Sequence, residues 1–304
     1  MKKTFYFCLC GIALFLFSCS TQSERTLLAD HVILIGLDGW GGYSVEKAEM
    51  PNVKALMENG SYTMKKRAVL PSSSAVNWAS MFMGAGPELH GYTEWGSKTP
   101  ELPSRVLGKN NIFPTIFQLL READADAEIG CFYEWEGIKH LIDTFSVSCF
   151  AQVPKERIYT DELKNMACDY IKEKKPVFAA IIFDNPDHVG HSAGHDTPSY
   201  YANLKELDCY VGDIIQATKE AGIYENTIFI VTSDHGGVGK GHGGKTMMEM
   251  ETPFVIAGKG IRKGGAFEES MMQFDCASTI AHIFDLEQPQ VWIGRPMLQV
   301  FSPE

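Results

Sequence analysis

An aspartate and a histidine stand side by side directly after an apolar run, in the segment Ser233-Asp234-His235-Gly236. The apolar run covers residues 227–232, and a further histidine, His242, follows in a glycine-rich stretch. We expect a buried strand that ends in these two side chains, and open α/β sheets build their sites at the carboxyl ends of strands. A carboxylate oxygen and an imidazole nitrogen are ligands that zinc accepts. The segment therefore predicts a metal centre at the edge of a sheet.

Two other apolar runs end in the same kind of side chain. Asp38 follows the run at 31–37, while Asp187 and His191 follow the run at 177–183. An aspartate after a strand is often only a turn or cap residue, so each one alone is weak evidence. Because the carboxyl ends of parallel strands meet at one edge, three aspartates and three histidines are expected to converge there. Such a set favours a two-metal site.

Metal-assisted phosphoryl transfer also needs a nucleophile, and a run of serines offers one. Pro71-Ser72-Ser73-Ser74-Ala75 lies just before a helix expected at 75–83. A hydroxyl at a helix N-terminus meets free backbone N–H groups and the positive end of the helix dipole. A helix cap is the alternative interpretation for each of these serines.

The elements that must position these residues alternate along the chain. Four apolar runs predict buried strands, at 31–37, 177–183, 227–232 and 253–257, with further strands near 62–70 and 127–132. Helices are expected at 51–57, 75–83, 114–122, 160–174, 198–221 and 275–284. This alternation is typical of one doubly wound α/β domain, with a mainly parallel sheet sandwiched by helices. Residues 87–150 are the least regular and are expected to form a cap or one side of the pocket.

Composition limits the class of partner. The chain has 304 residues, is 45% hydrophobic and carries a formal net charge of −11. Nucleic-acid polymers bind to basic faces, so no such partner is expected. An acidic protein still binds phosphate where metal ions supply positive charge. The oligomeric state is not indicated.

Eight cysteines give no sign of a zinc framework. Five lie beyond the N-terminal segment, at Cys131, Cys149, Cys168, Cys209 and Cys276, with no closely spaced pair. The last three fall in expected helices and are predicted to be buried. An odd number leaves at least one thiol unpaired.

The N-terminus has the pattern of an export signal. Lys2 and Lys3 precede an apolar stretch that ends in Leu16-Phe17-Ser18-Cys19, which resembles a bacterial lipobox. The resemblance implies a lipoprotein signal peptide at 1–18 and a lipid on Cys19. The polar residues that follow predict a tether at 19–30, and the remaining chain, 31–304, is expected to form one catalytic domain. The protein would then be exported and lipid-anchored to a bacterial membrane, in the periplasm or at the cell surface. Ordinary signal-peptidase cleavage near Ser20 is the alternative.

At the level of motifs, the chain resembles the alkaline phosphatase superfamily, and within it the type I phosphodiesterase/nucleotide pyrophosphatase family. The resemblance covers most of residues 31–300. Its nucleophile motif matches without a gap, and the pattern Asp-x-x-Gly-His-x-x-Gly is intact from Asp187 to Gly194. The matching segments are Pro71-Ser72-Ser73-Ser74-Ala75-Val76-Asn77, Met83-Gly84 and Pro87-Glu88-Leu89-His90-Gly91.

The resemblance implies an alkaline phosphatase-like fold, Ser74 as nucleophile and Asn77 as donor to a phosphoryl oxygen. It implies two Zn²⁺ ions, with Mn²⁺ as an alternative at one site. One ion would bind Asp38, Ser74, Asp234 and His235, and the other would bind Asp187, His191 and His242. The implied reaction is attack by Ser74 to form a phosphoseryl intermediate, which a hydroxide on the second metal then releases.

Two departures from the family bear on the substrate. His242 comes only seven residues after His235, where the family usually carries a long insertion, and Ser74 replaces the threonine common in diesterases. The leading hypothesis is a phosphodiesterase/pyrophosphatase acting on a small phosphate ester or nucleotide. A phosphomonoesterase or head-group phosphotransferase is the enzymatic alternative, and a lipid-anchored binding protein is the non-enzymatic one.

Five aromatic residues in the irregular region have two interpretations. Core packing is the default, and stacking against a substrate base is the alternative. The residues are Tyr92, Trp95, Phe132, Tyr133 and Trp135.

Overall fold

A computed structural model describes Met1 and residues 26–303 of the chain. Cys19 and all of the predicted signal peptide at 1–18 except Met1 lie outside the described residues. Eight strands form one sheet in the order β4-β3-β5-β1-β6-β7-β2-β8. The strands are β1 (His31–Leu37), β2 (Gly60–Arg67), β3 (Ile129–Tyr133), β4 (Cys149–Gln152), β5 (Phe178–Phe183), β6 (Thr227–Thr232), β7 (Glu251–Gly258) and β8 (Gly265–Ala266).

The sheet is mainly parallel, as predicted. β7 runs antiparallel to both of its neighbours, β6 and β2, whereas the other pairings are parallel. In the centre of the sheet, Leu37 of β1 lies opposite Phe183 of β5, and Gly36 lies opposite Thr232 of β6. This register brings the residues that follow the three strands to the same edge.

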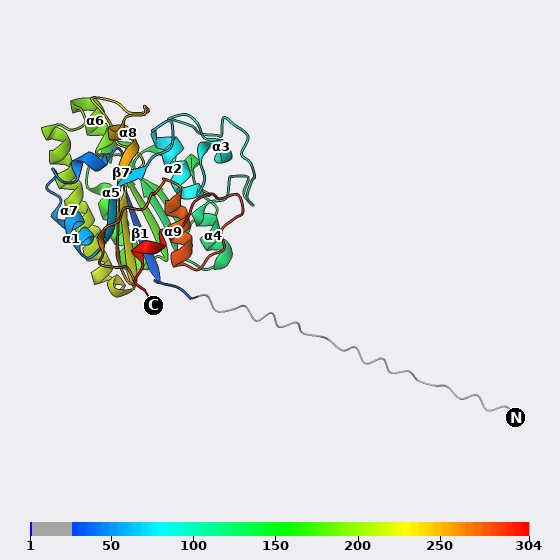
Figure 1. Ribbon diagram of the computed structural model, residues 1–304. Helices are drawn as coiled ribbons and strands as arrows, with labels where there is room; N and C mark the ends of the chain where they lie inside the picture. The colour runs from blue at the N-terminus through cyan, green and yellow to red at the C-terminus, as the bar shows by residue number, and fades with distance from the viewer. Residues whose placement is uncertain (2–25, 304) are drawn as a thin grey trace.

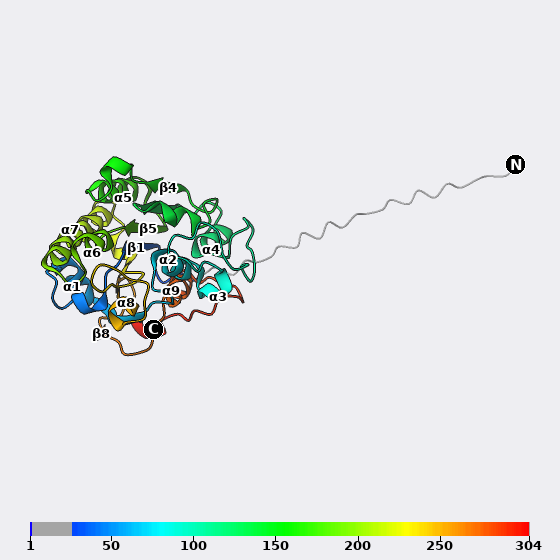
Figure 2. The ribbon, with the colours of Figure 1, turned by 90° about the horizontal axis from the view of Figure 1, so that it is seen from above.

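Helices cover both faces of the sheet (Figures 1 and 2). Side chains of β1 alternate between the faces: Ile33 and Ile35 pack into one buried cluster, while Val32 and Leu34 pack into the other. The predicted doubly wound sandwich is therefore confirmed. On the first face lie α1 (Pro51–Glu58), α5 (Glu162–Lys174) and α7 (Pro198–Glu220), and on the second α2 (Ser74–Met83), α4 (Ile116–Ala123) and α9 (Asp275–Ile283).

Three short helices complete the edge that carries the predicted ligands and the loops beside it. They are α3 (Pro87–His90), α6 (Asp187–Ala193) and α8 (Met247–Met250). The irregular region at 87–150 also extends the sheet, because it contains β3 and the start of β4. Within the part of the chain that the structure describes, no helix has both the length and the apolar character needed to cross a membrane.

One prediction about the cysteines is wrong. Cys168 and Cys276 are buried as expected, but Cys209 on α7 is exposed. A long helix on one face of a sheet buries only one side, and Cys209 lies on the other.

Candidate active site

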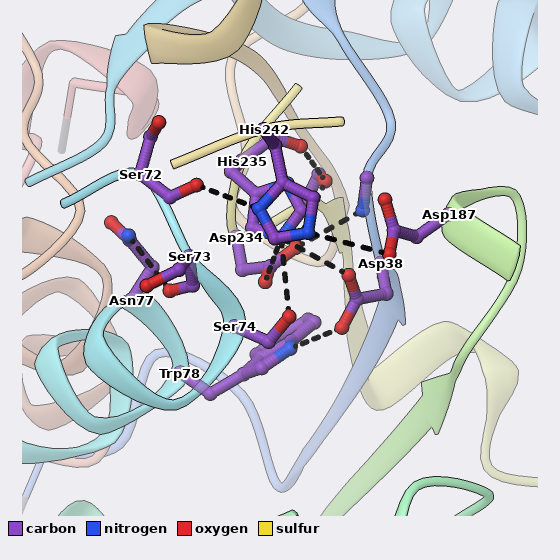
Figure 3. A network of polar contacts seen from close by, with 12 residues as sticks. Asp38, Ser72, Ser73, Ser74, Asn77, Trp78, Asp187, Asp234, His235 and His242 are labelled. Carbon is purple, nitrogen blue, oxygen red and sulfur yellow. Dashed lines mark hydrogen bonds and ion pairs between the residues drawn. The ribbon is translucent and has the colours of Figure 1, made fainter. Parts of the chain in front are cut away.

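The predicted ligands meet at the carboxyl edge of the central strands (Figure 3). Asp38 follows β1, Asp234 and His235 follow β6, and α6 begins at Asp187. The backbone N–H of Asp187 donates to the Asp38 carbonyl at 3.0 Å, which joins the two loops directly. Between them, Gly39 adopts φ +71° and packs so tightly that a Cβ there would lie 2.6 Å from Asp187 Cβ. Only glycine fits this approach without strain.

Each of the three histidines presents the same nitrogen to the centre. Nδ1 of His235, His242 and His191 lies within hydrogen-bond distance of a backbone carbonyl, at 2.8, 3.0 and 2.9 Å respectively. A carbonyl only accepts, so each Nδ1 carries a proton, and Nε2 is the atom that each ring turns toward the centre. This is how metal-binding histidines are oriented in proteins.

The carboxylates supply oxygens that no hydrogen bond satisfies. Asp38 Oδ1, Asp187 Oδ1 and Asp234 Oδ2 are buried and lack a hydrogen-bond partner among the described residues. Their other oxygens are held in place: Trp78 Nε1 donates to Asp38 Oδ2 at 2.9 Å, and Gly39 N–H donates to Asp234 Oδ1 at 3.2 Å. Unsatisfied buried oxygens are costly unless a cation binds them.

Two groups of side chains are compact enough to hold a metal ion. One contains Asp187, His191 and His242, as predicted for the second ion, and the other contains Asp38, Asp187 and His235. Asp187 therefore belongs to both groups. Asp234 Oδ2 also lies 3.3 Å from His235 Nε2, beside the second group. Buried carboxylate and neutral imidazole donors fit divalent zinc.

Burial and mutual repulsion perturb the carboxylates in the metal-free chain. Burial, with the charges of Asp234 and Asp187, raises the pKa of Asp38 well above its ordinary value. Burial also raises the pKa of Asp234 to about 7. Although burial opposes it, the imidazoles of His191 and His195, whose Nε2 atoms lie 3.1 and 3.5 Å from the carboxylate oxygens, hold the pKa of Asp187 below its ordinary value. A centre that resists holding three negative charges is one that a cation stabilises.

The histidines are perturbed in opposite directions. The hydrogen bond to Asp187 raises the pKa of the half-exposed His191 to about 9. Burial, followed by the charge of His235, lowers the pKa of His242 to about 4. Burial also lowers the pKa of His235.

Of the three serines, Ser74 is the one that faces the centre (Figure 3). Ser74 is the first residue of α2, and its Oγ lies 3.1 Å from His235 Nε2. Ser72 Oγ instead donates to the Gly244 carbonyl at 2.7 Å. Ser73 occupies the N-cap position, but its side chain makes no capping bond. The geometry thus separates three serines that composition alone cannot distinguish.

Asn77 makes contacts that differ from the expected donor role. It is fully buried, and Nδ2 lies 3.1–3.2 Å from the carbonyls of Val69, Pro71 and Ser73. Its Oδ1 accepts from Val69 N–H at 2.8 Å. In this structure Asn77 therefore holds the loop that carries the serines, and donation to a phosphoryl oxygen stays a prediction.

Two buried residues that sequence reasoning missed support the centre. Trp78, one turn of helix after the serines, orients Asp38 through its indole N–H. Lys66 of β2 is fully buried, and its Nζ donates to the Ser233 carbonyl and to Gln273 Oε1, both at 2.6 Å. In the sequence, Trp78 has the pattern of a core residue and Lys66 lies in a charged run typical of an exposed strand. Neither pattern predicts the contact with Asp38 or with Ser233.

The two histidines that flank the predicted ligands differ in burial. His188 is exposed and stacks on Tyr159, with ring centroids 3.9 Å apart. His195 is buried, with Nε2 3.5 Å from Asp187 Oδ1.

A cavity of about 470 Å³ opens beside the ligand group that contains His191 and His242. It is lined by Pro71, Ser73, Glu94, Trp95, His191, His242 and Gly243. Of the five aromatics with two interpretations, Tyr92, Phe132 and Tyr133 are buried in the core, and Trp135 packs against it. Trp95 differs, because 68% of it is exposed at this cavity.

Comparison with known proteins agrees with this architecture. Venom phosphodiesterase 2 of Crotalus adamanteus is 25% identical over 236 residues, covering 71% of this chain and 28% of the relative. Bis(5'-adenosyl)-triphosphatase enpp4 of Mus musculus is 25% identical over 221 residues, covering 68% of this chain and 47% of the relative. The chain thus spans between about a quarter and a half of the length of these relatives.

Among solved structures, murine ectonucleotide pyrophosphatase/phosphodiesterase 5, an inactive variant in complex with AMP, shares the fold. It aligns with a TM-score of 0.72 and 17% identity, covering 90% of this chain and 100% of that one. The family model for type I phosphodiesterase / nucleotide pyrophosphatase matches residues 32–258. This 304-residue chain therefore belongs to the type I phosphodiesterase/nucleotide pyrophosphatase family.

Proposed function

We propose that the protein is a metal-dependent hydrolase of phosphodiester or pyrophosphate bonds that uses Ser74 as a covalent nucleophile. The observation that carries the proposal is the position of Ser74 Oγ, at the N-terminus of α2 and 3.1 Å from His235 Nε2, beside three buried carboxylates. A lone hydroxyl placed among unsatisfied metal-type ligands is suited to attack on phosphorus.

The residues that would hold cations are those of the two groups. Asp187, His191 and His242 would bind one ion. Asp38 and His235 would bind the other, together with Asp234 and Ser74, which lie 3.3 and 3.1 Å from His235 Nε2. Zinc fits these donors, and Mn²⁺ is the alternative at one site. When bound, such cations supply positive charge that stabilises phosphoryl oxygens and favours deprotonation of a hydroxyl or water.

The chain's own groups account for the rest of the reaction. Ser74 Oγ attacks phosphorus to form a phosphoseryl ester, the bond to the first alcohol or phosphate group breaks, and the serine proton passes through solvent to that departing group. Water then attacks the same phosphorus, the bond to Ser74 Oγ breaks, and a proton of the water returns to the serine. Ser74 is the first residue of the ten-residue helix α2, and the positive end of the helix dipole there favours the anionic phosphoryl group.

A nucleotide is the substrate class that the relatives support. The names of the enpp4 relative and of the AMP-bound solved structure refer to adenine nucleotides. The cavity beside the metal ligands has room for a group attached to the phosphate.

The test is to measure initial rates of the purified protein with zinc on three chromogenic esters: bis-p-nitrophenyl phosphate, p-nitrophenyl-TMP and p-nitrophenyl phosphate. We expect both diesters to be hydrolysed faster than the monoester, and Ser74→Ala to abolish turnover. A preference for the monoester would instead identify a phosphomonoesterase. Absence of turnover with metal bound would favour the binding-protein alternative.

We further propose that the protein is exported and anchored to a bacterial membrane by a lipid on Cys19. The described chain enters β1 at the edge of the sheet opposite the site (Figure 1). A tether at this position would leave the cavity open to soluble substrate. Detergent phase partitioning of the protein made in a bacterial host, compared with Cys19→Ala, tests this: the variant should move to the aqueous phase, and equal partitioning would contradict the anchor.

A further inference from the structure

The predicted ligand His242 lies on a stretch of chain that has little side-chain packing of its own. Residues 236–244 contain six glycines. A Cβ built at Gly239, Gly241 or Gly243 would meet nothing within 4 Å, so these positions lie in open space. Glycine also loses more conformational freedom on folding than any other residue. The stretch therefore depends on hydrogen bonds from its neighbours to keep the histidine in one place.

Ser72, two residues before the nucleophile, supplies three of these hydrogen bonds. Its Oγ donates to the Gly244 carbonyl at 2.7 Å and accepts from Gly243 N–H at 3.1 Å. Its backbone carbonyl accepts from His242 Nδ1 at 3.0 Å (Figure 3). One serine thus contacts three consecutive residues of the stretch. Because Ser72 is fully buried, water cannot replace its hydroxyl, and alanine would remove both the acceptor of Gly243 N–H and the donor to the Gly244 carbonyl.

Glu249 holds the same stretch from its other end. This residue is only 5% exposed, and its Oε1 accepts from Gly244 N–H at 2.8 Å. Its Oε2 accepts from the backbone N–H and the hydroxyl of Thr246, at 3.1 and 2.6 Å. Gly244 is therefore bound through its carbonyl to Ser72 and through its N–H to Glu249. These contacts set the place of the neighbouring His242, whose Nε2 lies 3.6 Å from Asp187 Oδ2.

We propose that Ser72 is a positioning residue, which fixes His242 relative to the nucleophile Ser74 and so joins the two groups of metal ligands. This inference rests on the proposed function and adds a residue to it. The turn that places Ser74 Oγ beside His235 also carries the hydroxyl and the carbonyl that hold His242. Loss of the Ser72 hydroxyl therefore loosens the ligand group that contains His242 and leaves the group that contains His235 intact.

Calorimetric titration of the metal-free protein with zinc tests the proposal without turnover. We expect the wild type to bind two zinc ions, and Ser72→Ala to bind one of them about tenfold more weakly, the usual effect of removing a group that orients a metal ligand. Ser72→Thr keeps the hydroxyl and should restore most of the affinity. Ser80→Ala is the matched control, because Ser80 is a fully buried serine of α2 whose Oγ contacts the Val76 carbonyl and His90 Nε2. It should keep both affinities.

A double-mutant cycle identifies the ion that is affected. His242→Ala removes the ligand itself and should weaken one ion. Adding Ser72→Ala to His242→Ala should cause no further loss of zinc affinity, because the side chain that Ser72 positions is already gone. Glu249→Gln, which loosens the same stretch from its other end, should weaken zinc binding in the wild-type background and have no further effect in the His242→Ala background.

A kinetic readout separates positioning from a general loss of structure. In the proposed reaction Ser74 attacks beside His235, so the ligand group that contains His242 is left to serve the attack of water on the phosphoseryl ester. With bis-p-nitrophenyl phosphate, kcat of Ser72→Ala should fall by roughly tenfold, while kcat/KM, which reports the first step, stays near the wild-type value. The phosphate-linked adduct on Ser74 should accumulate in acid-quenched Ser72→Ala, and Ser80→Ala should change neither quantity.

Three outcomes would overturn the inference, and they differ in what else they contradict. If the wild type binds two zinc ions and Ser72→Ala binds both equally tightly, the positioning role is wrong while the proposed function stands. If Ser72→Ala weakens zinc binding as much in the His242→Ala background as in the wild type, Ser72 acts through general stability, and the inference again fails alone. If the wild type binds no zinc and shows no turnover, the proposed function and the inference fail together.

Discussion

The buried ammonium of Lys66 should make the stability of this protein depend on pH in the alkaline range. Lys66 is fully buried, and within the described part of the chain its ammonium group donates hydrogen bonds to two neutral oxygens, the Ser233 carbonyl and Gln273 Oε1. Burial lowers the pKa of Lys66 from its ordinary value of 10.5 to about 8, although the charges of Cys276, Asp234 and Asp275 oppose the shift. Replacement by methionine keeps a similar volume and removes the charge.

The direction follows from which state binds the proton more tightly. Because the pKa is lower in the folded chain, the unfolded chain holds more protons between pH 8 and pH 10.5, and the free energy of unfolding rises with pH there. Burying the charged form costs about 3 kcal/mol at pH 7, from 1.36 kcal/mol per pKa unit. Between pH 7 and pH 10 the wild type should therefore gain about 2 to 3 kcal/mol relative to Lys66→Met.

Urea unfolding of both proteins at pH 7, 8, 9 and 10, with metal removed and thiols reduced, measures this difference. Taking the difference cancels other groups that titrate in both chains. Lys65→Met is the matched control, since Lys65 is the exposed neighbour on the same strand, and its difference from the wild type should stay flat with pH. A constant difference between wild type and Lys66→Met across the range would refute the reasoning.

Three further substitutions test the support of the site. Trp78→Phe removes the indole N–H that donates to Asp38, and should weaken zinc binding about tenfold or more in calorimetric titration. Phe82→Leu, in the same core, should leave zinc affinity unchanged. Equal zinc affinities of Trp78→Phe and the wild type would contradict the role given to the indole. Gly39→Ala places a Cβ against Asp187 on a backbone with φ +71°, so we expect weaker zinc binding and a loss of about 1–2 kcal/mol in the free energy of unfolding in urea. If neither quantity changes, the loops that carry Asp38 and Asp187 are not tightly packed. Asn77→Ala removes the amide that holds the loop of serines, and should lower both kcat and the free energy of unfolding, the latter by about 3 kcal/mol. A loss of kcat with an unchanged free energy of unfolding would instead support direct donation from Asn77 to the substrate.

The central sheet could be predicted because its strands are buried on both faces. Such strands are continuous apolar runs, and the run at 227–232 coincides with β6 (Thr227–Thr232). The helices α2 and α7 were also foreseen within one residue at each end, since they begin and end at clear signals. Short elements were missed. β4 has four half-buried residues, and α6 has seven residues with a glycine inside, so neither has a period that a pattern can reveal.

For the candidate site, the residues that could bind a metal were predictable from the sequence, but the residues that hold those side chains in place were not. Asp38, Asp187 and Asp234 each follow or lie near the end of an apolar strand, and the register of β1 with its neighbours brings them together. The contact from Trp78 to Asp38 joins residues 40 positions apart, so no local pattern encodes it. The exposure of Trp95 likewise depends on how its loop is tied to α2, which composition does not report.

The most direct test of the central claim is to identify the residue that becomes covalently modified during turnover. The protein with zinc is mixed with a nucleotide diester, quenched in acid within the steady state and digested, and the peptide that contains Ser72, Ser73 and Ser74 is analysed by fragmentation mass spectrometry. We predict a phosphate-linked adduct on Ser74, absent from Ser74→Ala and retained by Ser73→Ala. Full turnover by Ser74→Ala, or an adduct on another residue, would contradict the account.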